Sequence, residues 1–594
     1  MMDSMHGLKR THDCGALGQQ NIGEDVVLMG WVLRRRDHGG VIFIDLRDRE
    51  GLTQVVFDPQ IDPTAHEKAH ALRNEYCIAV KGRVRRRPEG MENPKMQTGL
   101  IEVAADDLRI LNTSKTPPFP LDEEEKVSEN LRLKYRYMDL RRPWMMEGLL
   151  LRHKVCQEMR AFLNSEGFLE VETPILTRST PEGARDFLVP SRLSRGHFYA
   201  LPQSPQLYKQ ILMVAGIERY YQIARCFRDE DLRADRQPEF TQLDLEMSFV
   251  EEDDVMGLIE RLMKHLFSVC LGVDLSIPFR RMDFDHAMEH YGTDRPDIRF
   301  HMEFKDITDV ARGCGLKVFN AAADSGGVVK VLNARGMADL SRKNLDDLTN
   351  YAMDLGAKGL AWVKIKADGS WQSPIQKFFT TEEKAEITRR ADAGPGDCLF
   401  FGADERSMVF KVLGEIRLKL AQVRGLIDEN SYSFVWITDF PLLEYDEEEG
   451  RPSPVHHPFT APRDEDLELL QKEPLKVRSR AYDLVLNGVE IGGGSIRIHR
   501  KDIQDEIFKV LRIEDNDARD KFGFLLHALE FGAPPHGGIA FGLDRLVMLM
   551  GGRESIRDVM AFPKTQKGQC LMTGAPSNVS MEQLAELYLS VIKE

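Results

Sequence analysis

The segment from residue 219 to residue 249 holds the residues whose types and spacing most readily suggest chemistry. In its second half, Gln242, Asp244 and Glu246 alternate with apolar residues, which is the period of a half-buried β-strand. The first half is also predicted to be a strand, and the loop between the two strands carries acidic and basic side chains. A strand face with two carboxylates and an amide, opposite such a loop, can hold a zwitterionic or polyphosphate ligand. The alternative is an exposed hairpin whose charges pair with one another.

Two cations elsewhere in the chain lie in unusual surroundings. Lys209 interrupts an apolar, helix-like pattern, where it either serves a site or extends its ammonium to solvent along the helix surface. Arg545 lies in the first turn of a predicted buried helix, directly after the glycine- and proline-rich stretch GAPPHGGIAFG. A phosphate group is a natural partner for an arginine in that position.

A zinc site is not predicted. His456 and His457 are adjacent and would point to opposite faces of an extended chain, so they could not share one metal ion there. The eight cysteines are scattered singly, without a C-x-x-C pair. This distribution predicts reduced thiols in a cytoplasmic protein.

Length and composition predict a globular protein of several domains. The chain has 594 residues, of which 42% are hydrophobic. No apolar run approaches the length that spans a bilayer, and the N-terminal sequence lacks the apolar core of a signal peptide, so we expect no membrane association. The formal net charge is −15, so any nucleic-acid binding must come from local patches.

Residues 1–112 are predicted to form the first domain. From residue 26 to residue 112, five short strand patterns and one helix pattern match the OB-fold, a Greek-key barrel that often binds oligonucleotides. This span has fourteen Lys or Arg and thirteen Asp or Glu, a net charge of +1 against −16 for the remainder. Phe43 alternates in phase with Asp45 and Arg47, so its ring either stacks on an unpaired base or belongs to the core.

The rest of the chain divides where composition and pattern change. Residues 113–133 are rich in proline and then in acidic residues, which predicts a linker. Residues 300–425 contain their own strand and helix patterns, which predicts an inserted α+β domain. The insertion separates two parts of one domain, residues 134–299 and 426–563, and residues 564–594 form a C-terminal extension. The predicted fold class is α+β and multidomain.

Three stretches together resemble the signature motifs of class II aminoacyl-tRNA synthetases, subclass b. Residues 227–230 (FRDE) match the second motif, and residues 542–545 (GLDR) match the third. Gly167 and Pro174, in GFLEVETPIL, resemble the first motif, which builds the dimer interface in that family. The resemblance covers nearly the whole chain. It is closest to the bacterial aspartate–tRNA ligases, including the string FRDEDLRADRQPEFTQLD.

The resemblance implies both a fold and an activity. The fold has an N-terminal OB-fold anticodon-binding barrel, a catalytic domain built on an antiparallel sheet, and the inserted domain of the bacterial type. The activity is that of an ATP-dependent ligase, which converts L-aspartate to aspartyl-adenylate and transfers it to the 3′ end of tRNA-Asp. Magnesium accompanies ATP, and the implied assembly is a cytoplasmic homodimer. Because the aspartate carboxylate is already ionised at pH 7, activation needs placement against the α-phosphorus and neutralisation of charge, and no general base.

The resemblance also implies site residues by their positions. The aspartate site would contain Glu182, Gln206, Lys209, Arg228, Asp244, His456 and Arg497. The ATP site would contain Arg228, Asp229, Glu230, Gln237, Glu490, Gly542, Leu543, Asp544 and Arg545. The anticodon contacts would be Arg36, Phe43, Gln54 and Glu102. Arg228 and Arg545 would be catalytic, and Glu490 would hold magnesium through ATP.

The charges at these positions favour aspartate as the substrate. Free aspartate brings one ammonium and two carboxylates, so its site needs at least one carboxylate and two or more fixed cations. Glu182 and Asp244 can serve the ammonium, while Lys209 and Arg497 can hold the side-chain carboxylate. Arg228 can bridge the substrate α-carboxylate and the ATP α-phosphate. An asparagine-specific relative would not need a lysine in that role.

Glu490 and Arg497 give this assignment a geometric test. They are seven positions apart, so a regular strand would place their side chains on opposite faces. The glycines Gly492–Gly494 between them permit a bulge or the close approach of a ligand. We therefore predict a bulge or break between Gly492 and Ser495.

Two loop residues bear on which tRNAs are charged. Bacterial aspartate–tRNA ligases are either strict for tRNA-Asp or also charge tRNA-Asn, and His38 in RRRDHGG with Gly90 in RPEGMENP resembles the relaxed kind. The relaxed kind implies an amidotransferase partner that converts Asp-tRNA-Asn to Asn-tRNA-Asn. A strictly discriminating ligase is an alternative. Less favoured are a tRNA-independent asparagine synthetase on the same fold and a nucleic-acid-binding regulator with a decayed pocket.

Overall fold

The computed structural model describes residues 2–121, 127–180, 184–230 and 236–592. The chain forms two compact units, one made of Met1–Leu150 with Arg557–Asn578 and the other of Leu151–Ile556 with Val579–Glu594. None of the described helices has the length and apolar composition needed to cross a membrane.

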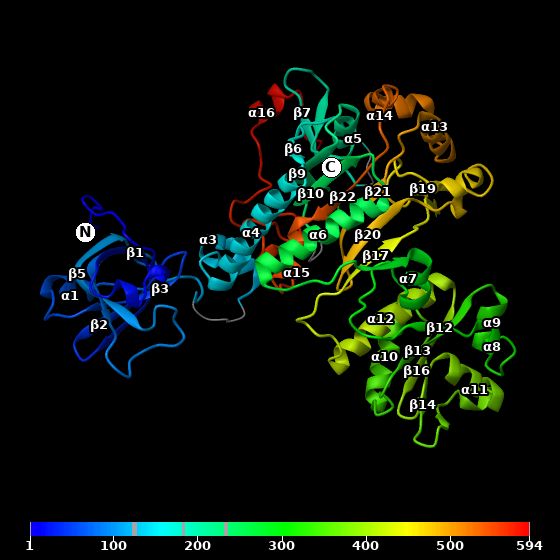
Figure 1. Cartoon of the computed structure of the whole chain (residues 1–594), viewed down its shortest axis with the longest axis horizontal. Helices are drawn as coiled ribbons and strands as arrows, with labels where there is room; N and C mark the ends of the chain where they lie inside the picture. The colour runs from blue at the N-terminus through cyan, green and yellow to red at the C-terminus, as the bar shows by residue number, and fades with distance from the viewer. Residues whose placement is uncertain (1, 122–126, 181–183, 231–235, 593–594) are drawn as a thin grey trace. The chain divides into compact units, whose positions relative to one another are not determined.

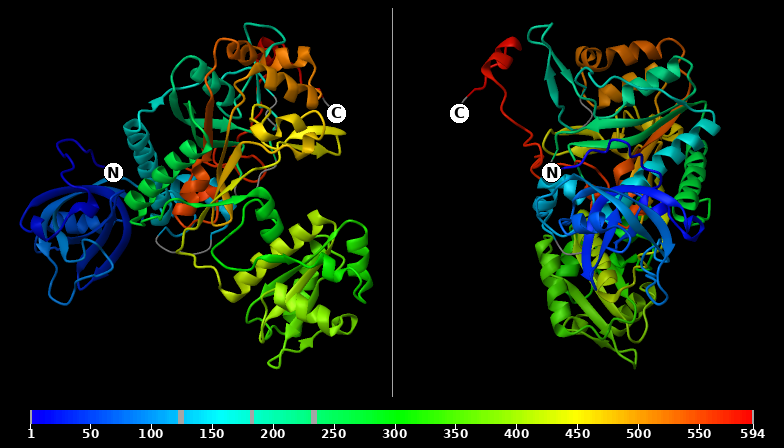
Figure 2. Two further views of the ribbon diagram at one scale, coloured as in Figure 1. Left: turned by 45° about the vertical axis from the view of Figure 1, so that its right-hand side comes forward. Right: turned by 90° about the vertical axis from the view of Figure 1, so that its left-hand side faces the viewer.

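The first unit contains a closed barrel of five strands, which Figures 1 and 2 show in blue. The strands are β1 (Asp25–His38), β2 (Val41–Arg47), β3 (Leu52–Phe57), β4 (Cys77–Arg86) and β5 (Ile101–Asn112), paired in the order β1-β2-β3-β5-β4. Helix α1 (Pro63–Ala69) connects β3 to β4, and the Asp62 side chain caps its N-terminus. Every second residue of the strands faces one apolar core, as with Ile42 and Ile44 of β2. The predicted OB-fold is confirmed.

Two short helices follow the barrel in the first unit. They are α2 (Glu129–Lys134) and α3 (Arg136–Asp139), and α4 (Pro143–Ser165) begins shortly after them. A small apolar cluster around Phe119, Leu121 and Met138 holds this segment together. Buried ion pairs add to it, since Asp139 accepts hydrogen bonds from Arg132 and Arg136.

The second unit is built on an eight-stranded sheet in the order β11-β17-β20-β21-β22-β10-β9-β6. The strands are β6 (Leu169–Glu170), β9 (Arg219–Phe227), β10 (Glu239–Ser248), β11 (Arg280–Asp283), β17 (Phe434–Thr438), β20 (Ala481–Leu486), β21 (Val489–Ile496) and β22 (His536–Gly542). The pairs β11–β17 and β6–β9 at its edges are parallel, and the pairs between them are antiparallel. This sheet confirms the predicted antiparallel catalytic fold.

Helices cover the sheet around its centre, and Figure 1 shows α6 running along it. They are α5 (Gln206–Val214), α6 (Glu252–Leu271) and α15 (Leu543–Met550). Leu243 and Leu245 of β10 are fully buried on one face, and Asp244 and Glu246 on the opposite face are only 1% and 0% exposed. The expectation of a half-buried strand was therefore wrong, because protein covers the polar face of β10 as well.

Strand β21 contains the predicted irregularity, but at a different position. The pairing of β21 with β20 shifts register at Ile491, so the extra residue lies between Glu490 and Gly492. From Gly492 to Ser495 the pairing with both neighbouring strands is regular, so the predicted location was wrong. The bulge still brings the side chains of Glu490 and Arg497 to one site, since both residues line the same cavity.

The glycines of β21 are needed for close packing rather than for the bulge. A Cβ atom on Gly492 would lie 2.4 Å from the Phe541 ring, and one on Gly494 would lie 2.1 Å from the Gly538 carbonyl oxygen. These distances are far below any real Cβ contact, so β21 can pair this closely with β22 only without side chains there.

The inserted region forms a sheet of its own in the order β12-β13-β16-β14-β15. Its strands are β12 (Phe304–Asp306), β13 (Val328–Ala334), β14 (Ala361–Ile365), β15 (Trp371–Gln372) and β16 (Cys398–Asp404). Helices α10 (Arg342–Asp354) and α12 (Arg406–Arg424) cover one face, and α8 (Thr308–Ala311), α9 (Lys317–Asp324) and α11 (Thr381–Arg390) cover the other (Figure 1). Each face has its own apolar core.

Shorter elements complete the second unit around the sheet. They are β7 (Leu188–Pro190), β8 (Phe198–Ala200), α7 (Phe284–Tyr291), β18 (Leu443–Asp446), β19 (Arg451–Pro454), α13 (Lys501–Val510), α14 (Asp515–Leu529) and α16 (Met581–Glu586).

Candidate active site

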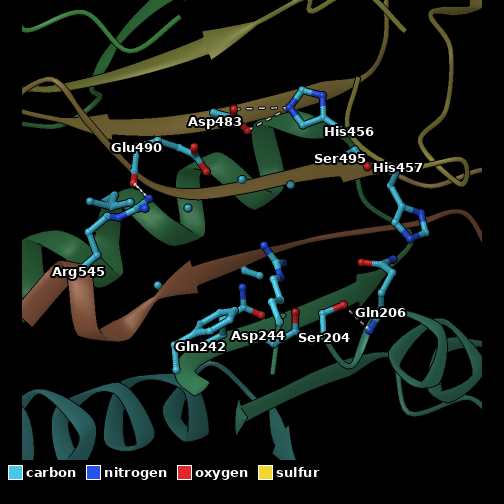
Figure 3. A pocket seen from close by; sticks show the side chains of 18 of the residues that line it. Ser204, Gln206, Gln242, Asp244, His456, His457, Asp483, Glu490, Ser495 and Arg545 are labelled. Carbon is cyan, nitrogen blue, oxygen red and sulfur yellow. Dashed lines mark hydrogen bonds and ion pairs between the residues drawn. The ribbon is translucent and has the colours of Figure 1, made fainter. Parts of the chain in front are cut away.

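A cavity of about 570 Å³ opens over the polar face of β10. The residues predicted from the sequence that line it are Gln206, Lys209, Arg228, Glu230, Gln237, Asp244, His456, Glu490, Arg497, Gly542, Asp544 and Arg545. Figure 3 shows Asp483, His456 and Glu490 on one wall, with Gln206 and Asp244 across the cavity from them. Asp229 and Leu543 lie outside the lining, since Asp229 is exposed on the loop and Leu543 is buried in α15. Glu182 lies outside the described residues.

Four charged side chains form a buried network at one end of the cavity, which we call the ion-pair end. Lys209 Nζ lies 2.7 Å from Asp244 Oδ1 and 3.2 Å from Glu246 Oε2. Arg497 Nε lies 3.0 Å from Glu246 Oε1, on the other side of that carboxylate. Two cations and two anions cancel here. Removing any one of them would leave a buried charge without its partner.

The pKa values of the two carboxylates at the ion-pair end shift in opposite directions, and their hydrogen bonding also differs. Loss of hydration opposes the ionisation of Glu246, but Arg497 and Lys209 outweigh it and lower its pKa to about 2. Burial raises the pKa of Asp244, although Lys209 partly compensates. Asp244 Oδ2 is buried and has no hydrogen-bond partner among the described residues, so it can accept a donor from a ligand.

Glu246 is a member of the site that the sequence motifs did not single out. The alternation of β10 does put it on the same face as Asp244, and that was the available signal. The structure shows that it is the bridge between Lys209 and Arg497. A Cβ atom on Gly538 would lie 2.1 Å from Glu246 Oε2, so β22 needs a glycine opposite this carboxylate.

The adjacent histidines face different charged groups of the cavity. His456 Nε2 is 3.4 Å from Asp483 Oδ1, and this carboxylate overcomes the loss of hydration and raises the pKa of His456. His457 Nδ1 accepts a hydrogen bond of 3.2 Å from the Phe459 backbone, so its Nε2 carries the proton. Loss of hydration, Arg497 and Lys209 lower the pKa of His457 to about 3. It is therefore a neutral donor at the ion-pair end.

His457 is thus the histidine that the sequence missed, since only His456 was predicted as a contact for the amino acid. Its Nε2 is buried and has no partner in the described ranges of the chain. Nothing in the motif distinguishes the two neighbours, because the choice depends on which of them faces Lys209 and Arg497. Within the part of the chain that the structure describes, no three His, Cys, Asp or Glu side chains cluster as a metal site.

The opposite end of the cavity, which we call the acidic end, is lined by Asp294, Asp483 and Glu490. Loss of hydration and then the charge of Asp483 raise the pKa of Glu490. A Cβ atom on Gly493 would lie 2.5 Å from Asp483 Oδ1, so this glycine leaves room for the carboxylate. Two carboxylates beside an open space are the ligands that Mg²⁺ uses when phosphates complete its coordination.

Residues around the β9–β10 loop form a further wall of the cavity. The Arg228 guanidinium lies 5.3 Å from the centre of the Phe240 ring, and its buried Nε has no partner among the residues described. Its backbone N–H donates to the Pro238 carbonyl, which closes the loop at 2.9 Å. Glu230 pairs with Arg236 at 3.1 Å, so this wall presents both charges and an aromatic face.

Asp544 and Arg545 at the start of α15 have different partners. Both carboxylate oxygens of Asp544 are occupied, one by Arg152 Nη1 at 2.5 Å and one by the Thr241 backbone N–H at 2.7 Å. These bonds hold the N-terminus of α15 against β10. Arg545 Nη1 donates to the Glu490 carbonyl at 2.5 Å, which fixes its guanidinium beside the acidic end.

The barrel has a polar patch that contains the predicted anticodon residues. Arg36 Nη2 donates to Asp45 Oδ1 at 2.6 Å and to Gln54 Oε1 at 3.3 Å. Gln54 donates to Glu102 at 2.9 Å, and Glu102 is only 2% exposed. Phe43 pairs opposite Arg36 and is outside the barrel core, on the outer face of β2.

The two residues predicted to affect tRNA choice are exposed on loops of the barrel. His38 ends β1 at the tip of the β1–β2 hairpin, where Gly39 and Gly40 adopt φ angles of +62° and +79°. Gly90 lies in the loop between β4 and β5 with a φ of +79°, and its N–H donates to Glu92 at 2.9 Å.

Comparison with known families agrees with this architecture. Residues 128–566 match the family model described as tRNA synthetases class II (D, K and N). The chain belongs to this family. Residues 26–111 of the synthetase match a second model, the OB-fold nucleic acid binding domain.

Close relatives match the synthetase over its full length. A protein named aspartate–tRNA(Asp/Asn) ligase from Desulfotalea psychrophila is 62% identical over 589 residues, which cover 99% of this chain and 97% of that protein. One with the same name from Desulfatibacillum aliphaticivorans is 58% identical over 594 residues, covering 100% of each.

Solved structures share the fold at lower identity. The asparaginyl-tRNA synthetase from Pyrococcus horikoshii, complexed with asparaginyl-adenylate, has a TM-score of 0.59 at 19% identity and covers 94% of this chain and 98% of its own. The aspartyl tRNA synthetase from Entamoeba histolytica has a TM-score of 0.56 at 18% identity, covering 94% and 92%.

Proposed function

We propose that this class II synthetase is an aspartate–tRNA ligase that charges tRNA-Asp and also tRNA-Asn. The observation that carries the proposal is the ion-pair end, where Lys209 and Arg497 are two buried, fixed cations beside an acceptor for an ammonium. That charge pattern is complementary to aspartate. The names of the full-length relatives support the same substrate and extend it to both tRNAs.

The side-chain carboxylate and the ammonium of aspartate have candidate partners at the ion-pair end. Lys209 and Arg497 would hold the side-chain carboxylate, and the free Oδ2 of Asp244 would accept from the ammonium. His457 would donate from its neutral Nε2 without adding charge. Gln206 lies on the same wall of the cavity as Asp244. Glu182 remains a predicted partner for the ammonium.

ATP would occupy the rest of the cavity. Arg228, Glu230 and Gln237 line this part, and the ring of Phe240 would stack on the adenine. Asp483 and Glu490 would hold Mg²⁺ together with the phosphates, and their mutual repulsion would be relieved by the ion. When bound, the ion supplies positive charge to the phosphate oxygens.

The chemistry that follows is adenylation and then transfer. The ionised α-carboxylate of aspartate attacks the α-phosphorus in line, and pyrophosphate leaves. Arg228 would bridge the two negative groups as they meet, and Arg545 would neutralise charge on the phosphates. The terminal ribose hydroxyl of tRNA then attacks the adenylate carbonyl, and AMP leaves.

Recognition of tRNA would lie on the OB-fold barrel. The ring of Phe43 and the patch of Arg36, Gln54 and Glu102 would contact the anticodon, with stacking and hydrogen bonds to unpaired bases. His38 and Gly90 would relax the choice between tRNA-Asp and tRNA-Asn. This proposal includes a cytoplasmic homodimer and an amidotransferase that uses the Asp-tRNA-Asn product.

The test is aspartate charging of purified tRNA-Asp and tRNA-Asn transcripts, side by side, with magnesium and ATP. We expect comparable charging of both, and we expect His38→Leu to restore preference for tRNA-Asp. Charging of tRNA-Asp alone would overturn the relaxed specificity, and charging of neither would overturn the ligase assignment.

A further inference from the structure

A buried carboxylate in the barrel has a role that neither base reading nor catalysis explains. Glu75 precedes β4 and is 4% exposed, with a φ angle of +64°. A non-glycine residue in this left-handed region is strained, so the surrounding structure must enforce the conformation. The Glu75 backbone N–H donates to the Val32 carbonyl at 2.7 Å, which ties this residue to β1.

Two arginines from different parts of the first unit meet at Glu75. Arg47 of β2 donates from Nη2 to Glu75 Oε2 at 2.8 Å, within the barrel. Arg141 lies between α3 and α4 and donates from Nη1 to the same oxygen at 2.7 Å. The Arg141 guanidinium also lies 4.7 Å from the centre of the Trp31 ring on β1. One charge-assisted bond and one cation–π contact therefore join the α3 segment to the barrel.

The α3 segment is in turn bound to the chain that follows the catalytic cavity. Arg136 is 2% exposed and donates to the carbonyls of Arg557, Met560 and Ala561, at 2.5, 2.7 and 2.9 Å. Asp139 holds the other side of its guanidinium at 2.6 Å. Residue 557 directly follows the last residue of the second unit that lines the cavity, Ile556.

We propose that Glu75 and Arg141 form a docking contact that fixes the barrel to the α3 segment, and so positions bound tRNA for the transfer step. Arg141 contacts the barrel, and Arg136, five residues earlier, binds residues 557–561. The Glu75–Arg141 contact is therefore the barrel end of a continuous series of contacts. Loss of this contact would loosen the attachment of the barrel to the α3 segment. The residues that line the cavity and the hydrogen bonds of Arg136 would stay unchanged. Glu75 and Arg141 are thus positioning residues. This role rests on the proposed function, since it concerns the step that uses tRNA.

The test uses the full-length protein with Arg141→Gln, which leaves the Arg47–Glu75 pair in place. We expect aspartate-dependent ATP–pyrophosphate exchange without tRNA to stay within about twofold of the unmodified protein. We expect kcat/KM for charging tRNA-Asp to fall about tenfold or more. Hydrogen exchange of residues 72–76 and 137–142 should speed up, because their shared contact is lost.

Two further variants keep the result interpretable. Arg49→Gln is the matched control, since Arg49 is an exposed barrel arginine paired with its neighbour Glu50. We expect it to change neither charging nor hydrogen exchange. The double variant Glu75→Gln with Arg141→Gln should lose less charging than the two single-variant losses combined, because the single changes share the Glu75–Arg141 bond.

Several outcomes would overturn the docking contact. One is tRNA charging by Arg141→Gln at the rate of the unmodified protein. Another is unchanged hydrogen exchange of residues 72–76 and 137–142. The third is an equal loss of ATP–pyrophosphate exchange and of tRNA charging. A protein that charged no tRNA at all would instead refute the proposed function. In that case hydrogen exchange alone would still decide whether Arg141 docks the barrel.

Discussion

The two ends of the cavity handle charge in opposite ways. At the ion-pair end, Lys209 and Arg497 meet two carboxylates, so the protein neutralises its own charges before any ligand arrives. At the acidic end, loss of hydration and the charge of Asp483 raise the pKa of Glu490. In the proposed function, the first end would exchange counter-charges with a small charged substrate. The second would receive positive charge together with phosphates.

The largest effect on the ion-pair end is expected from the substitution of Lys209. Lys209→Met leaves Asp244 and Glu246 buried with one cation fewer, and loss of a buried partner costs about 3–5 kcal/mol. We expect aspartate-dependent ATP–pyrophosphate exchange to fall about a thousandfold. Lys476→Met is the control, because Lys476 is an exposed lysine of the same unit paired with Glu473. A folded Lys209→Met protein with near-normal exchange would refute the role of this end.

A substitution at the acidic end should change the dependence of activity on magnesium and leave the KM for aspartate nearly unchanged. Glu490→Gln removes one of the two carboxylates that would hold the ion, so we expect exchange to fall about a hundredfold and to need more magnesium. The KM for aspartate should change little, because the ion-pair end is intact. Glu447→Gln, an exposed acid of the same unit, serves as the control. A rise in the aspartate KM with no change in magnesium dependence would contradict the division of the cavity.

His457 sharpens the comparison, since it would add a hydrogen bond without a charge. A hydrogen bond to a charged group contributes about 1.5–3 kcal/mol, so His457→Phe should raise the KM for aspartate about tenfold or more. His457→Gln keeps an N–H donor and should be affected less. The KM values of the two variants are measured at saturating ATP. Equal effects would mean that the ring fills space and donates no hydrogen bond.

The smallest expected effect is on acid stability. The folded-state pKa of Glu246 is about 2, below its usual 4.5, so its pairing with Arg497 and Lys209 stabilises the fold above pH 4.5. This stabilisation is lost as the pH falls from 4.5 towards 2. The unfolding free energy of the unmodified protein should therefore fall more steeply over that range than that of Glu246→Gln. Parallel pH profiles from denaturant titrations would count against the network.

Much of the fold could be predicted because local signals and tertiary structure agree. In the barrel, the β1–β2 turn needs positive φ at Gly39 and Gly40, and Ile42 and Ile44 alternate towards the core as a strand should. For β10 the alternation was right, but it could not tell solvent from a cavity wall. Asp244 and Glu246 are buried because α5 brings Lys209 over them, and that contact spans distant parts of the sequence.

The site was predictable to the extent that its residues lie within recognisable motifs. His457 and Asp483 were missed, and Glu246 was noted only for its place on the polar face of β10, because the partners of these residues lie far away in the chain. The bulge was misplaced for a related reason. Gly492 and Gly494 suggested its position, yet these glycines are required by Phe541 and Gly538 on the neighbouring strand.

The most direct test of the two-ended cavity is ATP–pyrophosphate exchange with aspartate and with asparagine in the same preparation. Asparagine has the same shape and one charge fewer, so it differs from aspartate only where Lys209 and Arg497 would act. We predict exchange with aspartate and, at equal concentration, exchange with asparagine at least about a thousandfold slower. Comparable exchange with both amino acids would contradict the assignment of the ion-pair end to a carboxylate side chain.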